Sequence, residues 1–193
     1  MRTRSVMVVL AVVLVVLVTG HVAADEKNPV ERFTCFAVNM TGSGSGAGVV
    51  QIAVERWSTD AEREMLRGTL VEKGPDALLA TLQKIKPRIG FMRLPNTMGW
   101  DLYYARDIRR EDGTRQVILA SDRRIAFGEV TRSSRSLDYD FTIIDIRFDA
   151  EGKGKGELAG AAKVSYNAKT NHIEIENYGA RPIDLINVKV DKK

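Results

Sequence analysis

The chain has 193 residues, with 29 lysines and arginines against 25 aspartates and glutamates, and its 44% apolar content is typical of a folded globular protein. The net charge of +4, to which Arg2 and Arg4 contribute, is too small to predict a nucleic-acid-binding surface. The densest basic stretch, residues 106–135, interleaves its arginines with aspartate and glutamate, as ordinary solvated surfaces do. Cys35 is the only cysteine, so an intramolecular disulfide is excluded and the fold must depend on its apolar core.

The first 24 residues have the three parts of a secretory signal peptide. Arg2 and Arg4 form a short basic start, an apolar run extends from Val6 to Val18, and small residues lead to Ala24. This run is shorter than the about 20 residues of a transmembrane helix, so we expect cleavage after Ala24, with a retained anchor as the alternative. Residues 25–193 would then be a single periplasmic or secreted domain without a membrane span.

Two extended runs open the mature chain. Residues 31–40 are apolar around Cys35, and residues 49–57 alternate between apolar and polar side chains, so we expect a hairpin with a buried cysteine. The link between them, residues 41–48, is rich in glycine and serine and predicts a flexible loop. It leads into a strand and not into a helix, which argues against a phosphate-binding loop.

Residues 59–86 carry the only clear helical pattern. Thr59 and Glu62 have the spacing of a capping box. Gly74-Pro75 predicts the end of one helix and the start of a second, which ends before Pro87. Each helix has one apolar side, so the pair is expected to cover one face or one open end of a sheet.

The remainder of the chain is predicted to form strands and turns. Asp112-Gly113, between extended runs 100–108 and 116–120, is a strong hairpin signal. Apolar side chains change face within residues 139–148, which indicates a β-bulge or a strand buried on both sides. Further strands are predicted at 89–94, 124–130, 157–166, 173–178 and 183–190.

These elements predict an α+β fold. About nine short strands with tight turns favour a mainly antiparallel sheet, as a sandwich or an open barrel, with the pair of helices at 59–86 inserted into it. Residues 149–156 are expected to be a turn and not a calcium loop, because Lys153 and Lys155 stand where oxygen ligands would be needed.

An aromatic row is the candidate ligand-binding feature. Trp100 and Tyr104 share one face of their predicted strand. Together with Phe91 they are expected to line a space for a small apolar ligand between sheet and helices, covered by loop 42–48, with ordinary core packing as the alternative.

Catalytic, metal-binding and cofactor-binding motifs do not stand out. His172, the only histidine of the mature chain, lies in a predicted turn, and one histidine with one cysteine does not make a zinc site. We therefore expect a non-enzymatic binding or accessory domain without metal or cofactor. A hydrolase that uses strand carboxylates such as Asp138 and Asp140 is one alternative, and a structural module that contacts a cell-envelope protein is another.

Four segments resemble an uncharacterised group of secreted bacterial proteins: WSTDAERE (57–64), GPDALLATLQ (74–83), DLYYARD (101–107) and IENYGARPIDLINVK (175–189). The resemblance extends over most of the mature chain. It implies a bacterial, periplasmic setting, and it implies no activity, cofactor or site residue.

Overall fold

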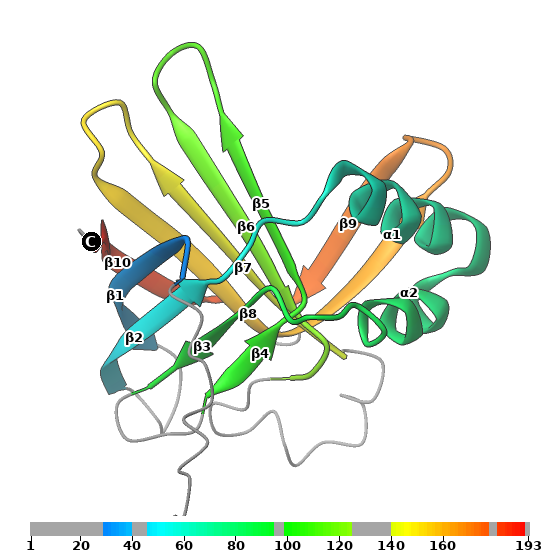
Figure 1. Ribbon diagram of the computed structural model, residues 1–193, viewed down its shortest axis with the longest axis horizontal. Helices are drawn as coiled ribbons and strands as arrows, with labels where there is room; N and C mark the ends of the chain where they lie inside the picture. Colours follow the sequence, from blue (N-terminus) through cyan, green and yellow to red (C-terminus); the bar gives the residue numbers. More distant parts are fainter. Residues whose placement is uncertain (1–28, 40–45, 95–98, 125–139, 178–180, 192–193) are drawn as a thin grey trace, which may run out of the picture.

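The computed structural model describes residues 29–39, 46–94, 99–124, 140–177 and 181–191, which form one antiparallel sheet with two helices (Figure 1). The expected export signal, most of the strand expected at 124–130 and Asp138 lie outside these residues. In the described part, neither helix is long and apolar enough to cross a bilayer.

The α+β fold with a mainly antiparallel sheet is confirmed, and the sheet nearly closes into a barrel. Its order is β4-β3-β2-β1-β10-β8-β7-β6-β5, and β9 pairs with the second half of β8. The strands are β1 (Glu31–Asn39), β2 (Gly46–Val54), β3 (Gly90–Arg93), β4 (Trp100–Leu102), β5 (Tyr104–Arg109), β6 (Arg115–Ser121), β7 (Phe141–Phe148), β8 (Gly154–Asn167), β9 (His172–Asn177) and β10 (Ile183–Val190). The helices are α1 (Asp60–Lys73) and α2 (Pro75–Leu82).

The barrel closes where one expected strand divides into two. The single strand predicted at 100–108 is β4 followed by β5, because the chain changes partner at Tyr103: β4 pairs with β3, whereas β5 pairs with β6. The Tyr103 amide donates to the Ala120 carbonyl at 2.9 Å, and the Ile89 amide donates to the Leu102 carbonyl at 2.8 Å. The chain itself thus joins the two ends of the strand order at Tyr103, and the Ser121 hydroxyl of β6 donates to the Asp101 carbonyl of β4 at 2.8 Å across this seam.

Alternate side chains of neighbouring strands fill the interior of the barrel. The large residues with almost no exposed surface include Phe33, Ile52, Leu119, Ile144, Leu158 and Leu185. Cys35 is fully buried among them, as predicted. The bulge expected within residues 139–148 lies on the neighbouring strand instead: Phe141 pairs with Ala162 and Ile143 with Ala159, so the extra residue belongs to β8.

The predicted capping box begins α1. The Glu62 amide donates to the Thr59 hydroxyl at 3.2 Å, and the Thr59 amide donates to the Glu62 carboxylate at 2.8 Å. Gly74, with a φ of 83°, separates the two helices as the sequence indicates. Both helices contact β8, so the pair covers one side of the barrel. Each helix buries two leucines on its inner side: Leu66 and Leu70 in α1, Leu78 and Leu82 in α2.

Candidate functional site

Two hairpin turns lie together at one end of the barrel (Figure 1). In the β5–β6 turn, the Asp112 carboxylate accepts hydrogen bonds from the Thr114 amide at 2.9 Å and from its hydroxyl at 2.6 Å. These two donors lower the pKa of Asp112. Gly113 has a φ of 82°, a conformation that glycine adopts without strain. The Asp-Gly hairpin expected from the sequence is therefore confirmed.

The second turn connects β7 to β8. The Asp149 carboxylate accepts a hydrogen bond from the Lys153 amide at 2.7 Å, and Gly152 has a φ of 79°. A Cβ on Gly113 would lie 3.4 Å from the Cβ of Ala150, so the two turns are in van der Waals contact. Both turn aspartates are thus occupied by backbone or hydroxyl donors of their own turn.

Arg115, the first residue of β6, lies below these turns. Its guanidinium donates to both carboxylate oxygens of Glu31 at 2.7 and 2.5 Å and to both oxygens of Asp107 at 2.7 and 3.2 Å. The two carboxylates raise the pKa of Arg115, so it stays charged. Arg109 also contacts Asp107, at 3.1 Å, so two cations face two carboxylates and the cluster leaves little net charge at this end of the barrel.

Aromatic rings pack under the Arg115 guanidinium. Its carbon lies 5.8 Å from the centre of the Phe33 ring, 5.9 Å from that of Trp57 and 5.7 Å from that of Phe148. These are cation–π distances. The ion cluster therefore lies on the apolar core and forms a rigid floor for the space between the turns.

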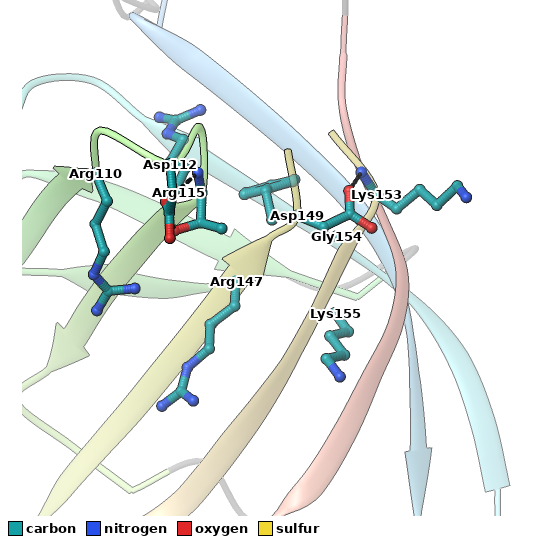
Figure 2. Close-up of a pocket in the computed structure, with 10 residues that line it drawn as sticks. Arg110, Asp112, Arg115, Arg147, Asp149, Lys153, Gly154 and Lys155 are labelled. Atoms are coloured by element: carbon teal, nitrogen blue, oxygen red, sulfur yellow. Dashed lines mark hydrogen bonds between the residues drawn. The ribbon is translucent and has the colours of Figure 1, made fainter. Parts of the chain in front are cut away.

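A groove with a volume of about 460 Å³ opens above this floor. Figure 2 shows side chains from both hairpins around it. Its lining is Arg110, Asp112, Thr114, Arg115, Arg147, Phe148, Asp149, Lys153, Gly154 and Lys155.

The groove carries more positive than negative charge. In the described part of the chain, no salt bridge involves Arg110, Lys153 or Lys155. Arg147 is paired with Asp145 at 2.8 Å, which raises the pKa of Arg147. Since the two lining aspartates are engaged in their turns, the arrangement favours an anionic group.

The three aromatic residues expected to line an apolar pocket are not brought together on one face. Trp100 pairs with Met92 and lies on the same face of the sheet as the buried Leu102. Phe91 pairs with Asp101 and lies on the opposite, outer face. On that outer side, the Arg88 guanidinium lies 5.0 Å from the centre of the Phe91 ring.

Tyr104 lies on β5, on the face opposite the fully buried Ala105. Tyr104 and Trp100 are partly buried and pack against the core. Burial raises the pKa of Tyr104. The alternative of ordinary core packing therefore describes these two residues well, while the expected apolar ligand stays a prediction.

The other candidate residues lie apart from one another. His172 is the exposed first residue of β9, where its ring contacts the Thr170 carbonyl. Asp140 precedes β7, outside the groove, and its expected partner Asp138 lies outside the described residues. Within the described ranges, no group of three or more histidine, cysteine, aspartate or glutamate side chains is placed to hold a metal ion.

Sequence reasoning found both turns but missed the groove. In the sequence, the arginines near residue 110 have the pattern of a solvated surface, and the lysines near residue 154, 44 positions farther on, have that of a turn. One signal in the sequence could have indicated the groove. In a run of consecutive antiparallel strands, every second turn lies at the same end of the sheet, so the β5–β6 and β7–β8 turns are expected to be neighbours.

Comparisons of the chain with protein-family models, with curated proteins and with solved structures found no match.

Proposed function

We propose that this chain is an exported, non-enzymatic binding protein that holds an anionic group in the groove between the β5–β6 and β7–β8 turns. The observation that carries the proposal is the charge of the lining. Arg110, Lys153 and Lys155 surround the groove without a salt bridge among the described residues, and Asp112 and Asp149 are engaged by their own turns.

The rigidity of the site supports binding. Hydrogen bonds within each turn and the contact between Gly113 and Ala150 hold the lining in place before a ligand arrives. A preformed site loses less side-chain and loop entropy on binding than a mobile one does. The described residues of the groove lining include no histidine and no pair of carboxylates free of turn hydrogen bonds, and this lining favours binding over hydrolysis.

The direct test is a titration of the isotope-labelled protein with inorganic phosphate and with pyrophosphate, followed by NMR. We expect amide signals of Gly113, Gly152 and Gly154 to shift together, and the affinity to fall as salt is added. The double variant K153Q/K155Q should bind roughly tenfold more weakly, since charge-assisted hydrogen bonds are lost.

A charge-matched control is the variant K84Q/K169Q. Lys84 follows α2 and Lys169 lies in the β8–β9 turn, and both are exposed and outside the groove. This control should bind pyrophosphate like the parent protein. Equal weakening in both double variants would show that only net charge matters, and the proposed site would be wrong.

Export is tested separately, by expression of the full chain in a Gram-negative bacterium and mass measurement of the product. The basic start, the apolar run and the small residues before Asp25 predict a periplasmic product that begins at Asp25. An intact N-terminus on cytoplasmic protein would contradict this part of the proposal.

A further inference from the structure

The outer surface next to the groove combines exposed apolar and basic side chains in one row. Phe36 on β1 and Ile186 on β10 are direct cross-strand partners and are 45% and 43% exposed. Phe36 is the only aromatic residue among the exposed large apolar side chains of the described part. Exposed apolar partners on adjacent strands form a contiguous patch, and such patches mark interaction surfaces.

A bulge in β10 brings this apolar pair beside the basic side chains. Leu185 pairs with Gly156 and Val188 with Gly154, so Ile186 and Asn187 both lie opposite Lys155. Asn187 has a φ of 52°, which lets Leu185 and Val188 both point inward while the two residues between them stay exposed. Ile186 is thereby a neighbour of Lys155 on the outside of the barrel.

The row continues onto β7. Lys155 pairs with Arg147, whose side chain is 65% exposed, and both line the groove. Figure 2 shows these two side chains extending in the same direction from neighbouring strands. We define the strip as Phe36, Ile186, Lys155 and Arg147: its first half is apolar, and its second half is basic and ends at the groove.

We propose that this strip and the groove together dock the chain on the surface of an anionic lipid bilayer, with lipid phosphates in the groove and with Phe36 and Ile186 in the headgroup region. The inference rests on the proposed function and identifies its anionic group. A single lipid is the weaker match, because Phe36 and Ile186 are exposed on the outer face of the sheet, whereas an acyl chain needs an enclosed cavity.

Charge on the next row sets the orientation of docking. Two residues farther from the turns along β8, Glu157 pairs with Asp184 of β10, and both are exposed. An anionic surface repels this acidic pair, so the barrel must approach with its hairpin turns leading and the acidic pair directed away. The same geometry predicts that E157Q/D184N strengthens binding to anionic vesicles.

The test is co-sedimentation of the protein with vesicles of phosphatidylcholine, with and without phosphatidylglycerol. Binding is expected only to vesicles that contain phosphatidylglycerol, and it should weaken with salt. The variant F36T/I186T places threonine, which has a high strand propensity, at both positions. It should bind vesicles roughly tenfold more weakly because apolar burial at the bilayer surface is lost. It should bind pyrophosphate like the parent protein.

The matched control is I173T/I175T, which removes a comparably exposed apolar pair, 47% and 53% exposed, from β9. This control should sediment with vesicles like the parent protein. A parent protein that binds pyrophosphate but no vesicles would overturn the membrane inference and leave the groove intact, whereas the absence of both would overturn both. Equal loss of vesicle binding in F36T/I186T and I173T/I175T would also overturn the membrane inference. So would a change of oligomeric state in F36T/I186T without vesicles, because it would show that a second copy of the chain covers this face.

Discussion

Arg115, at the start of β6, is bonded through two hydrogen bonds of 2.7 and 2.5 Å to Glu31, at the start of β1, although three strands separate β1 from β6 in the sheet order. The pair therefore spans the barrel interior at the end that carries the groove. Arg115 is only 13% exposed and Glu31 17%. An ion pair in this position fixes the distance between opposite walls of the barrel.

Removal of Arg115 should destabilise the fold strongly. The variant R115M leaves the partly buried Glu31 carboxylate without its cation and leaves Asp107 with the exposed Arg109 alone. The loss of one partner of such a pair costs about 3 kcal/mol. Urea unfolding at neutral pH measures the effect. The control is R109M: Arg109 also contacts Asp107 but is 72% exposed, so its removal should cost less than about 1 kcal/mol. Similar midpoints for R115M and R109M would contradict the bridging role.

A second prediction concerns Glu62 at the start of α1. Two hydrogen bonds from Arg56, at 2.8 and 2.9 Å, and one from the Thr59 amide lower the pKa of Glu62 from its ordinary value of 4.5 to about 2. The folded state thus binds a proton less readily than the unfolded state. The stabilisation is fully present above pH 4.5 and is lost as the pH falls toward 2.

The variant E62Q should therefore lower the free energy of unfolding by about 1–2 kcal/mol at neutral pH, and the difference from the parent should shrink in acid. Urea unfolding at several pH values between 2 and 7 gives both curves. The variant E64Q, on the exposed side of the same helix, should follow the parent curve. A constant difference between E62Q and the parent at every pH would show that the carboxylate charge is not involved.

Local sequence signals predicted the elements of this fold, because each signal involves residues close in the chain. Thr59 with Glu62 and Asp112 with Gly113 specify a helix start and a turn by hydrogen bonds and backbone preference alone. The change of partner at Tyr103 was missed, since the strand pattern of residues 100–108 is continuous and only closure of the barrel divides it.

The groove and its floor depend on contacts that no local pattern contains. Arg115 has the sequence context of a solvated strand end, and its burial follows from Glu31, 84 positions away. The basic lining likewise requires two separate turns to meet at Gly113 and Ala150. Electrostatic sites formed by distant segments need the tertiary structure, whereas the burial of Cys35 followed from its apolar neighbours alone.

A third prediction is that Cys35 does not react in the folded protein. The side chain is completely buried, and burial raises the pKa of its thiol to about 12, so the reactive thiolate is absent at neutral pH. A chromogenic disulfide reagent should modify the protein slowly without denaturant and rapidly in urea. Rapid modification of the folded protein, or a disulfide-linked dimer under oxidising conditions, would contradict the inward position of Cys35.

A fourth prediction compares two glycines whose surroundings differ. A Cβ on Gly156 in β8 would lie 2.5 Å from the carbonyl oxygen of Asp145 in β7, and backbone cannot move away without breaking the β7–β8 ladder. A Cβ on Gly68, within α1, would have no atom within 4 Å. The variant G156A should therefore destabilise the protein by about 3 kcal/mol or more, as overpacked sites do. The variant G68A should stabilise it by about 0.5–1 kcal/mol, since alanine loses less backbone entropy than glycine in a helix.

Thermal unfolding of both variants measures this difference in stability. Because Gly156 immediately follows Lys155, a destabilised G156A should also bind pyrophosphate more weakly than G68A does. A G156A protein as stable as its parent would show that β7 and β8 are not packed this closely.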